Sequence, residues 1–348
     1  MEIQRESIFV SALRGFCRAF FILLGGMLAL TVALLVYSAL SSPYKQEEKT
    51  SPEILPNLDW NREITTLTAP AILQINIHGV IGEPAKLDAT TIRTILADSR
   101  TGLLGNNRVK AILLHFDTPG GTVTDSDSIY RMLRDYKEHF KVPVYGYVEG
   151  LCASGGMYIA SATDKLFCGP SGVVGSVGVI IGPFFNFVDA MGKLGIQAKT
   201  LTDGLNKDMM SPFRTWKPNE DASLQALTSF FYQQFVDVVA AARTGMDKDR
   251  LVNEYGANVF DGPAALERGY VDAANSSYKE AVLALMQAAG IDPQKQYQII
   301  ELQPQFPLLN ALLNGTSPLA QGKIEHQLLI GSDKPFLVRD KVAYLYQP

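Results

Sequence analysis

Two side chains that could act as nucleophiles stand close together in the segment EGLCASGGMYIASA, residues 149–162. Cys152 and Ser154 precede a Gly-Gly pair, after which the apolar residues are spaced as in a helix. Serine is a preferred N-cap residue, so helix capping alone would explain Ser154. A serine at a helix N-terminus also lies beside free N–H groups that can stabilise an oxyanion. Capping and catalysis do not exclude each other, and the segment alone leaves both open.

A serine hydroxyl needs a general base before it can attack a carbonyl carbon. None of the four histidines stands out, because two lie within strand patterns, one ends a helical pattern and one is in the C-terminal tail: His78, His115, His139 and His326. A Ser-His-Asp triad stays open, since triads are defined by geometry and not by sequence order. The other solution is a lysine whose pKa is lowered by desolvation. Composition does not choose one lysine among many.

A second glycine-containing turn, DTPGGTV at residues 117–123, follows an apolar strand pattern and precedes a helical pattern. Its glycines can bring backbone N–H groups close to a ligand at a helix N-terminus. A simple strand-to-helix connection is the more common explanation of such a turn.

Strand and helix patterns alternate around these motifs, which predicts an α/β fold with parallel strands buried on both faces. Strands are predicted at residues 71–82, 109–117, 142–150, 165–170, 174–182 and 196–204, with a further strand, short helix and strand end in 256–274. Helices are predicted at residues 87–104, with Asp88 as N-cap, and at 125–140, 219–243 and 277–290. The helix at 219–243 carries an apolar stripe that predicts core packing: Leu224, Leu227, Phe231, Phe235 and Val238.

The N-terminal region predicts a membrane anchor. Residues 19–40 contain no charge and are long enough to cross a hydrocarbon core of about 30 Å as a helix. A cleavable signal peptide is the competing interpretation, although the apolar stretch exceeds the usual length of such a signal. Three arginines precede the span, so the positive-inside rule places residues 1–18 in the cytoplasm and the rest outside: Arg5, Arg14 and Arg18. Residues 41–68 contain three prolines and predict an extended linker.

Composition excludes some classes. The chain has 348 residues, 47% of them hydrophobic, and a formal net charge of -4 without a basic patch, so nothing indicates nucleic-acid binding. The three cysteines lack metal-ligand spacing, and an odd number cannot all pair within the chain.

Four motifs follow one another along the chain: DTPGG, CASGGMYIA, PSGVVGSVGV and NKDMMSPFR. In order and spacing they resemble the signal peptide peptidase A family, membrane-anchored Ser-Lys endopeptidases of the S49 type. The resemblance covers roughly residues 69–289, and four ordered motifs are far more specific than any one. It implies a fold similar to the ClpP and crotonase superfamily, a spiral of ββα units, here preceded by one N-terminal transmembrane helix. The domains would be a peptidase domain at 69–290 and a C-terminal extension of unknown role at 291–348.

The resemblance also implies roles for individual residues. Ser154 matches the nucleophile, Lys207 the general base, and Ser176 a serine that hydrogen-bonds the catalytic lysine. The oxyanion hole would combine N–H groups of these glycines: Gly155 with Gly120 or Gly121.

The chain departs from the family's pattern at a few positions. Asp117 and Thr118 stand where many relatives have Asn and Ser, and Met157 where an aromatic residue is frequent. The carboxylate of Asp117 would lie near the oxyanion site if it pointed inward. Cys152 is expected to be a small buried residue and not the nucleophile.

The resemblance further implies a homo-oligomeric ring, an octamer, because the chain has one copy of a domain that some relatives duplicate. Ser154 of one subunit would then meet Lys207 of its neighbour. No metal and no cofactor would be needed, and the substrates would be apolar peptides left in the bacterial inner membrane after signal peptidase cleavage. Two other functions stay open: a crotonase-like acyl-CoA hydratase or isomerase, and a non-catalytic oligomeric membrane scaffold.

Overall fold

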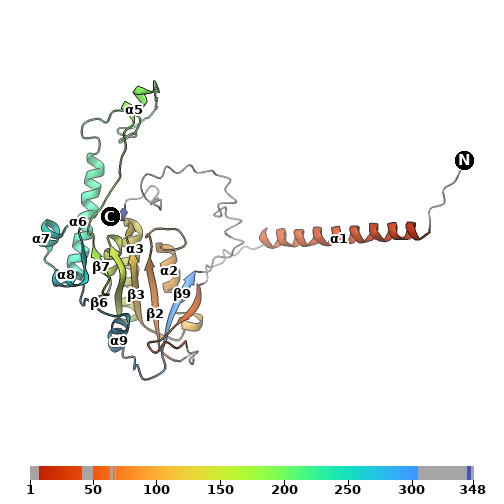
Figure 1. Ribbon diagram of the computed structural model, residues 1–348, viewed down its shortest axis with the longest axis horizontal. Coiled ribbons are helices and arrows are strands. Elements are labelled where there is room, and N and C mark those ends of the chain that lie inside the picture. The colour runs from red at the N-terminus through yellow and green to blue at the C-terminus, as the bar shows by residue number, and fades with distance from the viewer. Residues whose placement is uncertain (1–7, 41–49, 63–65, 67, 305–342, 346–348) are drawn as a thin grey trace. The chain divides into compact units, whose positions relative to one another are not determined.

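The computed structural model describes residues 8–40, 50–62, 66, 68–304 and 343–345. The chain divides into two compact units, Met1–Glu48 and Lys49–Pro348. The first unit contains the helix α1, Ile8–Leu40 (Figure 1). Within α1, Leu13–Leu34 is long and apolar enough to cross a membrane, with a mean hydropathy of 2.1. This is consistent with the predicted anchor.

The second unit is built on a sheet whose strands run in the order β1-β9-β2-β3-β5-β7-β8, with β6 also paired to β5. All neighbours from β9 to β7 are parallel, and the outer pairs β1–β9 and β7–β8 are antiparallel. The strands are β1 (Thr50–Leu55), β2 (Ala71–His78), β3 (Val109–Thr118), β5 (Val144–Ala153), β6 (Lys165–Cys168), β7 (Val173–Gly175), β8 (Val259–Asp261) and β9 (Gln298–Pro304). A separate two-stranded ladder pairs β4 (Gly120–Thr122) with β10 (Ala343–Leu345).

Helices cover both faces of the sheet, so the parallel strands are buried as their apolar sequences predict. The helices of this unit are α2 (Ala89–Asp98), α3 (Val123–Phe140), α4 (Gly155–Ala160), α5 (Val188–Lys193), α6 (Ala222–Ala242), α7 (Lys248–Arg250), α8 (Gly262–Glu267) and α9 (Tyr278–Ala289), with a 3-10 turn at Gly102–Leu104 and a π turn at Leu251–Tyr255. The larger core lies among α2, α3, α4, α6 and one face of the sheet. The smaller core lies under α9 on the other face.

Local sequence signals explain where several helices begin. The predicted N-cap of α2 is confirmed, because Asp88 Oδ1 accepts a hydrogen bond of 2.7 Å from the Thr91 amide. The α9 helix starts with a capping box between Ser277 and Glu280.

Two segments predicted to lie outside the folded domain belong to the sheet. Thr50–Leu55, predicted as linker, forms β1, and Gln298–Pro304, predicted as extension, forms β9 between β1 and β2. Asp98 at the end of α2 accepts hydrogen bonds from the amide and hydroxyl of Thr50 at 2.9 Å. The prediction was wrong here because strand pairing between residues about 250 apart in the chain leaves no local signal.

The segment after β7 also differs from its prediction. The strand predicted at 174–182 is limited to Val173–Gly175, and the strand predicted at 196–204 is absent. Residues 178–220, hereafter the arm, leave the sheet and extend away from it through α5 and back to α6 (Figure 1). Because no described strand pairs with them, residues 196–204 form no ladder.

The stripe of α6 is core only at one end. Phe235 is buried, as predicted, together with Val236 and Val239, whereas Leu227 is 39% exposed. The first half of α6 continues along the arm, where Leu227 and Phe230 are exposed among the described residues.

Candidate active site

Ser154 lies at the junction of β5 and α4 in a conformation that non-glycine residues rarely adopt. Its φ is 56° and its ψ is -116°, and the residue is fully buried. Backbone hydrogen bonds hold it there: its amide donates to the Gly175 carbonyl at 2.9 Å, and its carbonyl accepts from the Tyr158 amide at 3.1 Å. Such a conformation costs about 1–3 kcal/mol and persists only when the surrounding structure imposes it.

The Ser154 hydroxyl has no hydrogen-bond partner among the described residues, although its Oγ is buried. Ser154 occupies the N-cap position of α4, but its side chain makes no capping hydrogen bond. Helix capping therefore does not explain this serine. A buried hydroxyl without a partner costs about 1–3 kcal/mol, so this residue carries a second energetic penalty.

A bulge in β5 precedes Ser154 and changes the direction of the strand there. Along the β3–β5 ladder Phe116 pairs with Val148, but Thr118 pairs with Cys152, so residues 149–151 face the single residue Asp117. Asp117 Oδ1 accepts a hydrogen bond of 3.1 Å from the Leu151 amide. The carboxylate is thus used to close the bulge in β5. Beyond it β5 exchanges its neighbour β6 for β7.

The glycine turn lies against Ile81. The Ile81 amide donates to the Gly120 carbonyl and the Thr122 amide donates to the Ile81 carbonyl, both at 2.9 Å. A Cβ at Gly121 would lie 1.9 Å from the Ile81 carbonyl oxygen, so only glycine fits. The Gly120 amide donates to Thr118 Oγ1 at 3.1 Å and is therefore already engaged. Because amides of a strand point alternately to its two sides, Gly121 N–H faces away from Ile81, toward β10.

The start of α4 contacts this turn. A Cβ at Gly155 would lie 3.2 Å from the Gly121 amide nitrogen and 2.4 Å from Ser126 Oγ. The absence of a side chain at Gly155 therefore lets the first turn of α4 approach β4 closely.

Ser176 is the first residue after β7, the strand that pairs with the end of β5 just before Ser154. Ala153 pairs with Gly175 in the β5–β7 ladder, and the Ser176 amide donates to the Asn258 carbonyl at 2.8 Å. Ser176 is buried and, like Ser154, has a φ of 56°. The structure thus brings together Ser154, Ser176, Gly121 and Gly155.

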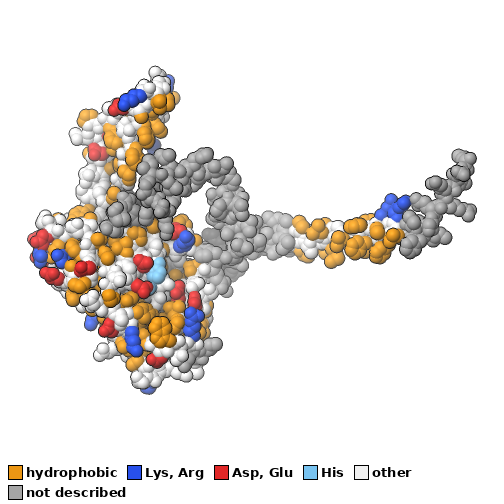
Figure 2. All heavy atoms as spheres, in the orientation of Figure 1, with side chains coloured by type: hydrophobic (Ala, Val, Ile, Leu, Met, Phe, Trp, Pro, Cys, Tyr) orange, Lys and Arg blue, Asp and Glu red, His pale blue; other side chains and the backbone are white. Residues whose placement is uncertain are grey.

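Lys207 does not join this cluster within one chain. It is exposed and lies in the arm, where its amide donates to the Gly204 carbonyl at 3.3 Å. The arm also carries exposed apolar side chains: Phe184, Phe185, Phe187, Leu194, Ile196, Leu201, Leu205 and Phe213. Figure 2 shows hydrophobic atoms at the surface of this region. A surface of this kind is typical of a protein contact.

Cys152 is fully buried, and burial raises the pKa of its thiol. A thiol held protonated is a poor nucleophile. Its predicted role as a packing residue is confirmed.

None of the described histidines bonds to Ser154. His78 Nε2 and His115 Nδ1 are 2.9 Å apart, and His115 Nε2 is 3.2 Å from a Glu149 carboxylate oxygen. Burial lowers the pKa of both imidazoles. His139 ends α3, and His326 lies outside the described residues.

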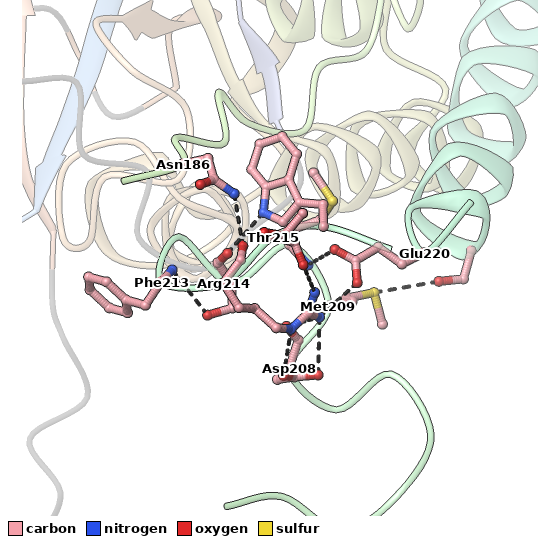
Figure 3. Close-up of polar contacts among 11 residues, drawn as sticks. Asn186, Asp208, Met209, Phe213, Arg214, Thr215 and Glu220 are labelled. Carbon is pink, nitrogen blue, oxygen red and sulfur yellow. Dashed lines mark hydrogen bonds and ion pairs between the residues drawn. The ribbon is translucent and has the colours of Figure 1, made fainter. Parts of the chain in front are cut away.

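The sequence did not predict a charged network that lies next to Lys207. Arg214 binds Asp208 and Glu220, both six residues away, within the arm and at its junction with α6 (Figure 3). Residues six positions apart do not contact each other within a helix or a strand, so the sequence carries no pairing signal for these residues.

Comparison with known proteins defines the class. The model of peptidase family S49 matches residues 137–292, and that of Clp protease matches residues 89–171. A Synechocystis protein named as a protease is 32% identical over 73% of this chain and 87% of its own length. An Enterococcus faecium protein named as a signal peptide peptidase is 30% identical over 71% of this chain and 73% of its own. A chloroplast serine protease of Arabidopsis thaliana is 27% identical over 60% of this chain and 30% of its own.

The chain belongs to peptidase family S49. It has the Clp protease-like fold and is a serine peptidase similar to the signal peptide peptidases. This excludes the two alternatives, the acyl-CoA hydratase or isomerase and the non-catalytic scaffold.

Proposed function

We propose that this protein is a membrane-anchored endopeptidase in which Ser154 is the nucleophile and Lys207 is the general base. The buried, unpartnered hydroxyl of Ser154 is the observation that carries the proposal. A group that costs stability through both its backbone conformation and its missing hydrogen bond is typical of a functional site. The position of Ser154 beside two glycine N–H groups supports an acyl-transfer reaction in particular.

Lys207 reaches Ser154 from a neighbouring subunit in this proposal. Two observations support this contact between subunits. Ser154 Oγ has no partner among the described residues, and Lys207 is exposed on an arm that carries exposed apolar side chains. Packing the arm on a second copy would bury those side chains and exclude water from the amine. An amine accepts a proton only in its neutral form, which removal from water favours. A ring of subunits, such as an octamer, would repeat this contact.

The reaction then follows from the positions of the groups. Ser154 Oγ attacks the substrate carbonyl carbon while its proton passes to the Lys207 amine, which Ser176 orients. The N–H group of Gly155, together with that of Gly120 or Gly121, stabilises the oxyanion. Collapse of the intermediate releases the amine with the proton from Lys207 and leaves an acyl-enzyme. Water hydrolyses the acyl-enzyme by the same two steps.

Peptide substrates bind as an extended strand beside β4. The pairing of β4 with the chain's own β10 supports this, because the register Tyr344 to Gly121 is that of an antiparallel ladder. A strand edge of this kind recognises main chain irrespective of sequence. Together with the apolar helix α1, it suits cleaved signal peptides in the bacterial inner membrane, with the catalytic unit outside and residues 1–18 in the cytoplasm.

The test is subunit mixing. Ser154→Ala and Lys207→Ala should each lose cleavage of an apolar peptide, and co-expression of the two variants should restore part of it, because mixed contacts would contain one intact Ser154 and one intact Lys207. Lys199→Ala, a change at another exposed arm lysine, is the matched control and should retain activity. Undiminished cleavage by either single variant would overturn the dyad. Single variants that fail and do not restore each other would overturn the shared site.

A further inference from the structure

The loop that carries Lys207 has an unusual backbone for an exposed segment. Asn206 and Met210 flank Lys207 at φ values of 57° and 55°. Left-handed conformations are unfavourable for side chains such as methionine, so this shape needs external support. The support comes from Glu220, whose Oε1 accepts a hydrogen bond of 3.2 Å from the Met210 amide.

Arg214 is the centre of that support, as Figure 3 shows. Its Nε and Nη2 donate to the two carboxylate oxygens of Asp208 at 2.7 and 3.1 Å, and Nη2 also donates to the Asp208 carbonyl at 2.8 Å. Nη2 is 2.7 Å from Glu220 Oε2, and Nη1 donates to the Thr215 carbonyl at 3.0 Å. All three guanidinium nitrogens are therefore engaged, in a planar arrangement that a lysine cannot reproduce.

The network is partly buried, most of all at Glu220. The side chain of Glu220 is 2% exposed, and those of Asp208 and Arg214 are 21% and 24% exposed. Hydrogen bonds to Arg214 lower the pKa of both carboxylic acids, which keeps them ionised at neutral pH. Buried pairs with several hydrogen bonds fix geometry better than exposed ones.

The network connects Lys207 to the core through α6. Glu220 lies two residues before the start of α6, and the second half of α6 is anchored in the core by Phe235. Midway, Gln234 Nε2 donates to Asp127 Oδ1 and to the Tyr158 hydroxyl, both at 3.1 Å, and Tyr158 belongs to α4. A continuous chain of contacts thus runs from the helix that starts at Ser154 to the residue next to Lys207.

A second set of contacts ties the loop to the outgoing part of the arm. Asn186 Nδ2 donates to the Arg214 carbonyl at 2.9 Å, and the Phe187 amide donates to the Pro212 carbonyl at 2.8 Å. The outgoing and returning segments of the arm are therefore held together at Arg214.

We propose that Arg214 is a positioning residue: with Asp208 and Glu220 it holds the Lys207 loop in the shape that delivers the amine to a neighbouring Ser154. The inference rests on the proposed function of Lys207. Its physical reason is that a flexible lysine on a projecting loop would lose the fixed geometry that general base catalysis requires.

The first test replaces the guanidinium but keeps its charge. Arg214→Lys should lower kcat on an apolar peptide about 10- to 100-fold with KM unchanged, since misplacement by about 1 Å has effects of this size. Labelling of Ser154 by a fluorophosphonate should slow by the same factor. Arg250→Lys is the matched control, because Arg250 pairs with Glu254 at 2.6 Å at an exposed position away from Lys207.

A purely structural role gives a different result. Loss of activity that accompanies a lower oligomer mass, or a rise in KM with kcat retained, would overturn positioning. Wild-type kcat and labelling rate in Arg214→Lys would overturn it as well. Glu220→Gln is a second variant if Arg214→Lys does not fold: it retains an acceptor for Met210 but removes the carboxylate from Arg214, and it should also lower kcat at constant KM.

Mixing separates the two proposals. Arg214→Ala should regain activity when co-expressed with Ser154→Ala, which supplies an intact Lys207 loop, but not with Lys207→Ala. Recovery with Lys207→Ala would overturn the inference alone. Full activity of Lys207→Ala would overturn the proposed function, whereas full activity of Arg214→Lys beside an inactive Lys207→Ala would overturn only the role of Arg214.

Discussion

Ser154, the proposed nucleophile, has two features that lower the stability of the folded state. Its φ of 56° and its unpartnered Oγ both raise the free energy of the folded state. Backbone hydrogen bonds to Gly175 and Tyr158 maintain this state. A hydroxyl that is not committed to a cap remains available to a general base and a substrate.

This arrangement predicts a gain of stability on removal of the hydroxyl. In a Lys207→Ala background, where no amine reaches the hydroxyl from another subunit, Ser154→Ala should raise Tm by about 2–6 °C, because the buried polar atom without a partner disappears while the methyl group fits the same space. Differential scanning calorimetry of the full chain in detergent measures it. Ser161→Ala is the matched control: Ser161 is also buried, but its Oγ donates to the Met157 carbonyl at 3.0 Å, so its loss should not stabilise. A lower Tm for Ser154→Ala would contradict the energetic account.

At the scale of elements, the arm differs from the rest of the domain in what holds it together. The sheet and its helices are stabilised by buried apolar residues, whereas the loop at 206–216 is held by Arg214 and by main-chain contacts. The conformation of this loop should therefore depend on pH, whereas that of the sheet should not.

The pKa shifts of Asp208 and Glu220 determine in which direction the loop responds to pH. Both Asp208 and Glu220 have lowered pKa values because of their hydrogen bonds to Arg214, so their contribution is complete above the unfolded pKa values of about 4 and is lost as pH falls further. Trp216 reports on the loop, since its Nε1 donates to the Ser211 carbonyl at 2.9 Å. In a Trp60→Phe background, Trp216 emission should be constant above about pH 5 and shift to the red as pH falls below about 4.

The control for this acid transition is Arg214→Ala. Its emission should already be shifted at pH 7 and should lack the step near pH 4, because no cation depresses the two pKa values. An identical acid step in both proteins would assign it to other groups. Far-UV circular dichroism should remain constant through the step in the wild type.

At the scale of the whole molecule, the sheet depends on β9, which is far from β1 and β2 in the sequence. β9 lies between β1 and β2, and its central residues Ile299 and Ile300 are fully buried. Without β9 the strand β1 would lose its partner and the edge of β2 would be exposed.

Two truncations test this dependence. A chain that ends at Gly290, the boundary predicted from sequence, should be insoluble or unfolded, whereas a chain that ends at Pro304 should retain the far-UV circular dichroism of the sheet. The truncation removes the buried side chains of Ile291, Ile299, Ile300 and Leu302. Each contributes about 1.5–3 kcal/mol, so the loss is comparable to the net stability of a typical domain, about 5–15 kcal/mol. A folded chain ending at Gly290 would show that β9 is dispensable.

The sequence by itself determined the local features of this protein. Asp88 predicts its helix start, the alternation of apolar runs predicts the parallel strands, and the ordered motifs identify the S49 family. The same motifs carry the proposal that Ser154 and Lys207 form the catalytic dyad. These signals are local because propensity, capping and turn chemistry act over a few residues.

Only the tertiary structure decided what depends on distant parts of the chain. It assigned Asp117 to the β5 bulge, inserted β9 into the sheet, moved residues 196–204 from a predicted strand into the arm, and joined Arg214 to Asp208 and Glu220. The left-handed conformation of Ser154 belongs to the same group, because hydrogen bonds from another strand and from α4 impose it. Local sequence does not encode which long-range partners a residue will find, and those partners determine how the site is built.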